Sequence, residues 1–380
     1  MQYRTFGPLD WQPSALGFGA MRLPTLDDDP ARIDEPLATR MVRYAIDHGV
    51  NYVDTAYPYH RGESERFLGR ALQDGYRQRV KLATKMPTWL TKEPGDFDRY
   101  LDEQLERLQT EHVDFYLLHS MNQEKWPQMQ ELNVFDWADK ARADGRIRHL
   151  GFSFHDTLAA FKEIVDGYDG WTLAQIQYNY MDVEYQAGTR GLEYAAEKGL
   201  AVVVMEPLRG GQLTKEPPPS VAALWAGAPA RRTPADWALQ WVWNQPQVSL
   251  LLSGMSSMQH VEENVASAAR SGVGTLTPAE LAVVDQVHTA YRGLCPISCT
   301  NCKYCMPCPN GVNIPRIFEI YNDSVMYDDL KRAQAFYQWV SAENRADRCV
   351  ECGECEEQCP QNLPIIEWLK KAHELLGKAE

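Results

Sequence analysis

Cysteine is absent from the first 294 residues of this 380-residue chain, and all nine cysteines lie between Cys295 and Cys359. A secreted protein held together by disulfides would rarely have so long a region without cysteine. Closely spaced cysteines in an intracellular chain are instead typical of metal ligands. A chain of 380 residues is also longer than one core usually supports. We therefore expect two domains, residues 1–290 and 291–380.

The chain also lacks an excess of basic residues: 38 Lys and Arg stand against 52 Asp and Glu, a net charge of −14. This charge argues against binding to nucleic acid and to anionic membrane surfaces. No apolar run approaches the roughly 20 residues of a membrane-spanning helix. Residues 1–10 lack the basic and apolar regions of a signal peptide. We expect a cytoplasmic protein whose partners are a small-molecule substrate and a redox partner protein.

Short apolar runs alternate with amphipathic stretches through the region without cysteine. Eight runs resemble strands: residues 15–18, 52–56, 80–84, 115–118, 149–153, 174–177, 201–205 and 249–254. Stretches between them have helical spacing: residues 39–48, 63–72, 97–108, 135–143, 191–198, 234–243 and 258–269. This alternation predicts an α/β fold, a (β/α)₈ barrel of parallel strands. We expect residues 5–14 to plug the bottom of the barrel, residues 217–219 to form a loop, and a capped helix to start at Thr277.

The nine cysteines include two compact runs. The second is Cys349-x-x-Cys352-x-x-Cys355-x-x-x-Cys359-Pro360, and the first is Cys299-x-x-Cys302-x-x-Cys305-x-x-Cys308-Pro309. In such spacings three thiolates surround one iron–sulfur cube, and the fourth, before proline, ligates the other cube. We therefore predict two [4Fe–4S] clusters. The expected ligand sets are Cys299, Cys302, Cys305 and Cys359 for one cluster, and Cys308, Cys349, Cys352 and Cys355 for the other.

The 40 residues between the two runs, 309–348, are rich in helix formers. The region thus resembles the helical two-cluster ferredoxin modules that are attached to many redox enzymes. Cys295 is left over, and the first run is one residue short before its last cysteine. The alternative interpretation is two tetrahedral zinc ions, since eight thiolates could hold them. Two tight runs that each end in Cys-Pro favour iron–sulfur clusters.

Ionisable side chains stand at the carboxyl ends of three predicted strands, where barrel enzymes have their active sites. Asp54, Lys85 and His119 occupy these ends, and Tyr59 lies in the loop after the second strand. A neighbouring lysine lowers the pKa of a phenol, and a paired carboxylate positions that lysine. Tyrosine can then protonate an oxygen while a cofactor supplies hydride. Each residue alone could be structural, but their convergence favours catalysis.

Further motifs extend over about residues 1–290. They are Asp54–Tyr59, Gly62–Glu65, Leu68-Gly69, Asp114–His119, Gly145-x-Ile147-Arg148-x-x-Gly151-x-Ser153, Gln175–Asn179, Pro207-Leu208-x-x-Gly211-x-Leu213 and Glu263-Asn264. With Lys85, this set resembles the aldo/keto reductase family. The resemblance implies a catalytic tetrad of Asp54, Tyr59, Lys85 and His119. Trp89, just past Lys85, could line the substrate pocket.

The resemblance also implies a nicotinamide cofactor. It places nicotinamide contacts at Ser153 and Gln177 and adenine contacts at Glu263 and Asn264. We also expect cofactor contacts at Pro207, Leu208, Arg209, Gly211 and Gly254, since backbone N–H groups and the Arg209 charge could approach a pyrophosphate. Phe154 stands where the family usually has asparagine, and Met205 where it usually has an aromatic residue. Residues 254–259 contain no Lys or Arg that could hold the 2′-phosphate of NADP. NADH, NADPH and a flavin therefore all stay open as cofactors.

Together these features predict an oxidoreductase. The expected reaction is NAD(P)-dependent reduction or oxidation of a carbonyl or alcohol, coupled to electron transfer through the two clusters. Because a hydride carries two electrons and a cluster takes one, a flavin is the usual bridge between them. The alternatives are a flavin-containing iron–sulfur electron-transfer reductase and a redox-sensing nucleotide-binding subunit.

Overall fold

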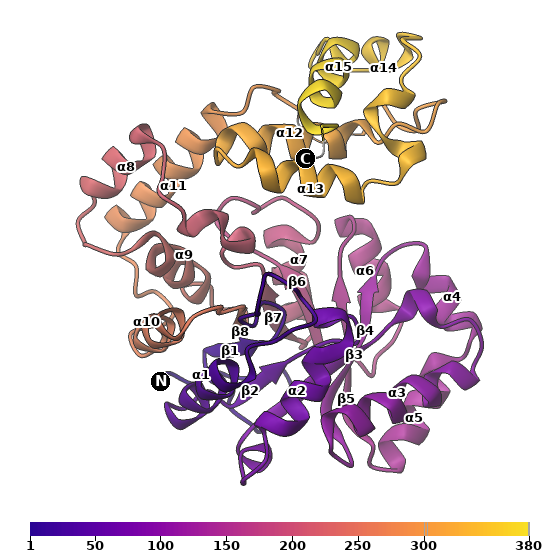
Figure 1. Ribbon diagram of the computed structural model, residues 1–380, viewed down its shortest axis with the longest axis vertical. Coiled ribbons are helices and arrows are strands. Elements are labelled where there is room, and N and C mark those ends of the chain that lie inside the picture. Colours follow the sequence, from indigo (N-terminus) through magenta and orange to yellow (C-terminus); the bar gives the residue numbers. More distant parts are fainter. Residues whose placement is uncertain (300, 302, 379–380) are drawn as a thin grey trace. The chain divides into compact units, whose positions relative to one another are not determined.

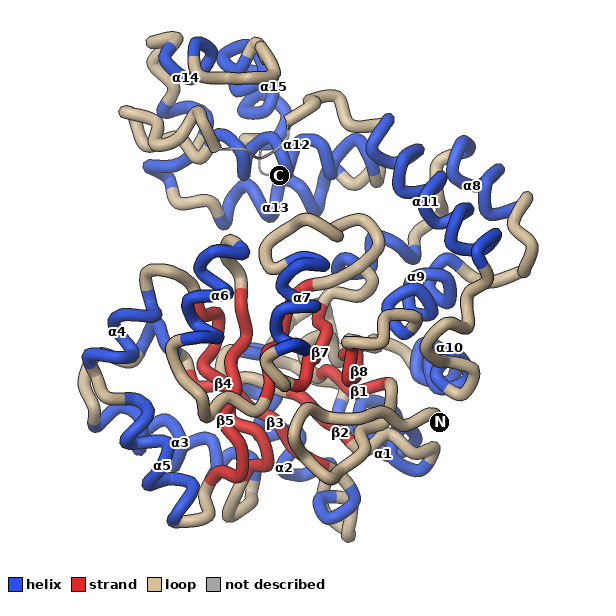
Figure 2. The backbone as a smooth tube through the Cα atoms, turned by 180° about the vertical axis from the view of Figure 1, so that it is seen from behind, coloured by secondary structure: helices blue, strands red, loops and turns tan. Residues whose placement is uncertain are grey.

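The computed structural model describes residues 1–299, 301 and 303–378. Eight parallel strands close into a barrel in chain order, β1 to β8 (Figures 1 and 2). The strands are β1 (Leu16–Gly19), β2 (Tyr52–Asp54), β3 (Lys81–Met86), β4 (Val113–Met121), β5 (Ile147–Phe154), β6 (Leu173–Gln177), β7 (Ala201–Met205) and β8 (Val248–Ser253). The predicted parallel barrel is therefore confirmed, with all eight strands in their expected places.

Helices connect consecutive strands and surround the barrel (Figure 2). They are α1 (Glu35–Asp47), α2 (Glu63–Ala71), α3 (Gly95–Leu108), α4 (Lys125–Glu131), α5 (Val134–Ala143), α6 (Leu158–Asp166), α7 (Gly188–Glu197), α9 (Pro234–Trp243) and α10 (Met258–Ala268). Short 3₁₀ turns include η1 (Tyr59–Gly62) and η4 (Arg209–Thr214). Helices α4 and α6 were not predicted.

The segment before β1 fills the bottom of the barrel, as predicted. Phe6 is fully buried among side chains that the strands point inward, including Tyr52, Phe115 and Leu250. Its ring lies 5.0 Å from that of Phe115 and 5.4 Å from that of Trp11. Side chains alternate along a strand, so these inward-pointing residues establish which other residues of each strand point into the barrel. The residues two or four positions further along each strand therefore face the barrel interior nearer its mouth.

The chain divides into two compact units, residues 1–214 with 232–281, and residues 215–231 with 282–380. The elements that follow β8 and α10 are α11 (Pro278–Gly293), α12 (Ile314–Met326), α13 (Leu330–Trp339), α14 (Glu354–Glu357) and α15 (Ile365–Leu376). A core of its own, including Ile317, Phe318, Tyr337 and Leu369, lies between α12, α13 and α15. The predicted boundary at residue 290 lies within α11.

Two local predictions had different outcomes. Thr277 caps α11 as expected: its hydroxyl accepts a bond from the backbone N–H of Glu280, whose carboxylate accepts one from the backbone N–H of Thr277. The predicted loop at residues 217–219 was wrong at its last residue, because Pro219 begins α8 (Pro219–Ala226). Proline is favoured at the first helical position, where its missing N–H costs nothing. Among the described residues, no helix is both long and apolar enough to span a membrane.

Candidate active site and cysteine-lined hollows

Lys85 is the buried centre of the barrel mouth. It lies on β3, and its side chain is fully buried. Its Nζ donates to Asp54 Oδ1 at 2.7 Å and to the carbonyl oxygen of Thr55 at 2.7 Å, and lies 3.4 Å from the Tyr59 hydroxyl. Asp54 ends β2, and Tyr59 begins η1, just beyond it. A carboxylate, an ammonium and a phenol thus form one contiguous hydrogen-bonded group, as predicted for these three residues.

The protonation states of this group follow from its burial and charges. Burial is the largest single influence on the pKa of Lys85 and lowers it, but the charges and hydrogen bonds of Asp54 and Tyr59 together outweigh burial, so that the pKa lies above its ordinary value. Burial raises the pKa of Tyr59, and the nearby Lys85 ammonium only partly opposes this. The lysine acts in the direction we expected, but burial has the larger effect. Lys85 is therefore charged and Tyr59 is a protonated donor at neutral pH.

His119 lies beside Tyr59 near the end of β4. The two rings are 6.1 Å apart and nearly perpendicular, and the Trp89 ring lies 5.2 Å from the imidazole on another side. The pairing of β4 with β5 is irregular between Leu118 and Met121, so the strand bulges where His119 stands. Bulges redirect side chains and are common beside active sites. The structure thus brings all four predicted tetrad residues together.

The imidazole of His119 is neutral at neutral pH. Burial lowers its pKa well below the ordinary value, and the charges of Lys85, His155 and Lys125 lower it further. Its buried Nδ1 has no hydrogen-bond partner among the described residues. An unpaired polar atom in a buried place costs free energy unless a ligand or water satisfies it. A neutral imidazole here can hydrogen-bond a substrate oxygen without protonating it.

The two residues predicted to contact nicotinamide face the barrel mouth. Ser153 is buried on β5, and its hydroxyl accepts a bond from the backbone N–H of Ser120 at 2.8 Å. Gln177 ends β6, and its amide donates to Asp182 Oδ2 at 2.9 Å. The side-chain amide of Gln177 is therefore already engaged within the protein.

Gln175 is a candidate cofactor contact that was not predicted from the sequence. It lies two residues before Gln177 on β6, so it faces the barrel interior on the same side. It is almost fully buried, and its Oε1 accepts no bond from any described residue. Its amide nitrogen lies 3.6 Å from the sulfur of Met205. Sequence spacing alone cannot tell which of Gln175 and Gln177 contacts a cofactor, because both lie on the same face of β6. Their hydrogen-bond partners distinguish them, and those are visible only in the structure.

The loop after β7 has a constrained backbone. Arg209, Gly210 and Gly211 all have positive φ, at 49°, 64° and 95°. The Arg209 guanidinium donates to Asp182 at 3.1 Å, and the backbone N–H of Gly211 donates to the carbonyl oxygen of Leu208 at 2.9 Å. Glycine adopts this conformation without strain, so only Arg209 is strained, and such residues concentrate at binding sites. Pro207 opens this loop, which follows β7 directly and so lies at the mouth of the barrel.

The other predicted cofactor residues follow β8. Asn264 on α10 is buried and donates to the Ser253 hydroxyl at 3.0 Å, whereas Glu263 is exposed. A Cβ atom on Gly254 would lie 3.2 Å from the Arg22 side chain, so this position is closely packed. Phe154 is buried against Phe161 of α6, with ring centroids 5.1 Å apart. Phe154 therefore packs between β5 and α6.

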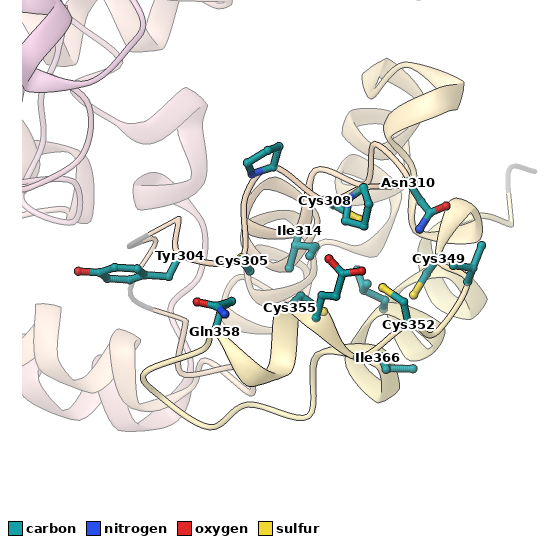
Figure 3. A pocket seen from close by; sticks show the side chains of 16 residues that line it. Tyr304, Cys305, Cys308, Asn310, Ile314, Cys349, Cys352, Cys355, Gln358 and Ile366 are labelled. Carbon is teal, nitrogen blue, oxygen red and sulfur yellow. The ribbon is translucent and has the colours of Figure 1, made fainter.

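Two hollows in the second compact unit are lined by thiols. The first contains Cys308, Cys349, Cys352 and Cys355 in its wall, and Figure 3 shows these side chains around it. The second contains Cys299, Cys305 and Cys359. Cys302 lies outside the described residues. Cys305 and Ile314 line both hollows, so the two share a wall.

The loops around these hollows are sharply curved. Asn301, Lys303, Glu351 and Gly353, which alternate with the cysteines of the two runs, all have positive φ. The backbone N–H of Asn301 donates to the sulfur of Cys299 at 3.4 Å. Burial, together with neighbouring acidic groups, raises the pKa of the Cys355 thiol to about 11. Bound cationic iron would offset that cost, because a metal stabilises the thiolate.

Comparisons with known proteins agree with this geometry. The model of the aldo/keto reductase family matches residues 15–288, and that of the 4Fe-4S dicluster domain matches residues 298–363. L-galactose dehydrogenase of Arabidopsis thaliana is 31% identical over 288 residues, covering 70% of this chain and 88% of that protein. Aflatoxin B1 aldehyde reductase member 4 of Homo sapiens is 26% identical, covering 70% of this chain and 92% of that protein.

Solved structures extend the likeness to the fold. A holo-form aldo-keto reductase from Bacillus halodurans has a TM-score of 0.64 and 27% identity, covering 76% of this chain and 96% of its own. An aldo-keto reductase from Klebsiella pneumoniae, solved in complex with NADPH, has a TM-score of 0.59 and 28% identity, covering 76% of this chain and 96% of its own. This chain is therefore an oxidoreductase that belongs to the aldo/keto reductase family and carries a 4Fe-4S dicluster domain after its barrel.

Proposed function

We propose that the barrel reduces a carbonyl to an alcohol, or performs the reverse reaction, with NAD(P)H. The observation that carries this proposal is the buried contact between Lys85, Asp54 and Tyr59 beside a neutral His119. NAD(P)H, when bound, supplies the hydride. His119 orients the carbonyl oxygen, and Tyr59 donates its proton to that oxygen as the carbon gains hydride. The Lys85 ammonium stabilises the phenolate that is left, and Asp54 positions the lysine.

The residues around the mouth fit a nicotinamide cofactor. Gln175 has a buried amide oxygen that no described residue pairs, and Ser153 presents a hydroxyl at the same level of the barrel. The positive-φ loop at Arg209 and Gly211, together with Asn264, would hold the remainder of the dinucleotide. The proposal is tested by incubating the protein with NADH or NADPH and a panel of aldehydes and ketones. Loss of the cofactor's absorbance measures its oxidation. No turnover of any carbonyl with either cofactor would contradict it and favour a nucleotide-sensing role.

We propose that each hollow holds one [4Fe–4S] cluster. The ligands would be Cys308, Cys349, Cys352 and Cys355 in the first hollow, and Cys299, Cys302, Cys305 and Cys359 in the second. The lining of the hollows supports this division, because each described cysteine lines the hollow to which its spacing assigns it. The shared wall at Cys305 would place the clusters next to each other. Adjacent clusters are suited to passing single electrons to a redox partner protein.

Coupling between barrel and clusters requires a carrier that separates two electrons. A hydride brings two electrons and each cluster takes one, and a flavin is the group with that chemistry. The visible spectrum of anaerobically purified protein tests this step. A flavin peak above the broad cluster absorbance would support coupling through a bound flavin. Cluster absorbance alone would favour clusters that exchange electrons independently of the barrel.

The first expected result concerns metal content. Anaerobically purified protein should contain about eight irons and about eight acid-labile sulfides per chain, because two cubes of four irons each are proposed. Elemental and sulfide analysis measures both. A reproducible value of about four would mean that the shortened Cys305-x-x-Cys308 spacing prevents one of the two clusters from forming. Zinc in place of iron would contradict both sites.

The second expected result concerns Cys352→Ser. This change removes one thiol of the first hollow and should abolish electron transfer to a one-electron dye or a ferredoxin. Binding of the nicotinamide should be retained, because the barrel has its own core. Cys295→Ser is the matched control, since Cys295 is outside both runs. Retained dye reduction with only a lower melting temperature would mean that the clusters are structural.

A further inference from the structure

Lys125 is a half-buried ammonium at the barrel mouth that the tetrad chemistry does not use. It begins α4, directly after β4, and its Nζ donates to the carbonyl oxygen of Ser120 at 2.9 Å. Across the described part of the chain, no carboxylate oxygen lies within 4.0 Å of this nitrogen. Burial lowers the pKa of Lys125, which the charge of Glu124 partly opposes. A partly buried cation without a counter-ion is costly unless a ligand supplies the negative charge.

The position of Lys125 connects it to the reacting centre. Its Nζ lies 5.6 Å from the centre of the Trp89 ring, and that ring lies 5.2 Å from the His119 imidazole. The charge of Lys125 is also felt by His119, whose pKa it lowers. Trp89 is 42% exposed, so its ring offers an open apolar surface beside the histidine. A molecule with its carbonyl at Tyr59 and His119 could therefore pack on Trp89 and extend toward Lys125.

Nearby acidic groups do not neutralise this cation. Glu124 is exposed on the preceding residue, and the Asp156 carboxylate accepts bonds from the backbone N–H groups of Gln123 and Thr157. Within the tetrad the charges of Asp54 and Lys85 cancel as a pair. The Lys125 ammonium is therefore a positive charge at the barrel mouth that no carboxylate oxygen of the described residues contacts within 4.0 Å.

We propose that the preferred substrate is an anionic carbonyl compound, with an apolar body and a carboxylate or phosphate group that pairs with Lys125. The inference rests on the proposed carbonyl reduction and adds the class of substrate. The apolar body packs on Trp89, while the anion receives the remaining N–H groups of the ammonium. Burial of the apolar body gives affinity, and the charge gives selectivity over neutral compounds.

Matched substrates test this proposal. The acid 4-carboxybenzaldehyde and its neutral ester methyl 4-formylbenzoate carry the same aldehyde on the same ring. The wild-type ratio of kcat/KM, acid over ester, should exceed unity, and Lys125→Met should lower that ratio about tenfold or more through KM, as for the loss of a charge-assisted hydrogen bond. Lys125→Arg should retain most of the preference. Lys140→Met, an exposed lysine on α5, should leave the ratio unchanged.

A binding measurement separates this inference from the proposed reaction. Calorimetry of the full chain with benzoate, benzamide and inorganic phosphate needs no turnover. Binding of benzoate or phosphate that is lost in Lys125→Met would support the anion site even if no aldehyde were reduced. The probe that binds more tightly indicates whether the substrate's anionic group is a carboxylate or a phosphate. Equal binding of benzoate and benzamide, or an acid-to-ester ratio that Lys125→Met does not change, would overturn the proposal.

Discussion

Tyr59→Phe should lower kcat for carbonyl reduction by on the order of 10²-fold or more, because it removes the proton donor and leaves the ring in place. The phenol oxygen lies 3.4 Å from the Lys85 ammonium, whose raised pKa makes it a poorer proton donor than its ordinary value would. Nicotinamide binding should persist, which titration of intrinsic fluorescence with NADPH measures. Tyr57→Phe is the matched control, since that phenol bonds Glu103 instead. Unchanged turnover in Tyr59→Phe would exclude the tetrad assignment.

The pH profile provides a second test of Tyr59. Reduction needs the protonated phenol, so the rate falls as pH rises through the pKa of Tyr59. Burial raises that pKa above its ordinary value, which is about 10 for tyrosine. We therefore expect a rate of reduction that is level through neutral pH and declines only under strongly alkaline conditions. A decline near neutral pH would indicate a different proton donor.

Lys85→Met should be as damaging to kcat as Tyr59→Phe, and it should also destabilise the barrel. The change leaves the Asp54 carboxylate buried without its partner. Removing one member of a buried ion pair typically costs about 3–5 kcal/mol. The loss would be visible as a lower free energy of unfolding of the barrel, measured by denaturant titration. Activity should fall because the phenolate at Tyr59 would lack its stabilising cation.

A double variant separates the two effects of Lys85→Met. Asp54→Asn with Lys85→Met removes both charges, so it should be more stable than Lys85→Met alone while staying inactive. Lys81→Met is a control on the same strand, since Lys81 is half exposed and pairs with Asp114 outside the mouth. Full activity in Lys85→Met would contradict the assigned role. Wild-type stability in Lys85→Met would contradict the buried ion pair.

Much of the site followed from local patterns. Alternation of strands and helices predicted the barrel, and the carboxyl ends of its strands located Asp54, Lys85 and His119. Local sequence also predicted three of the four ligands of each proposed cluster, because three thiols at short spacing can reach one point without help from the rest of the fold. The Thr277 cap was predictable for the same reason, since donor and acceptor are three residues apart.

Properties that depend on residues far apart in the chain were decided by the tertiary structure. Gln177 Oε1 accepts a bond from the amide of Gln186, a residue outside β6, whereas Gln175 Oε1 accepts none from any described residue. The raised pKa of Tyr59 depends on how completely the closed barrel removes water, which no motif encodes. Helix α8 begins within a proline run that local rules treat as a loop.

Lys125 illustrates the same division. The sequence by itself determined that a lysine follows the fourth strand, and its patterns predicted the fold class and favoured iron–sulfur clusters over zinc. Only barrel closure and the bulge after Leu118 decided that this lysine lies beside Trp89 and, among the described residues, without a carboxylate partner. The physical reason is that hydrophobic patterning specifies which faces are buried, whereas distances between side chains of different strands follow from register and packing.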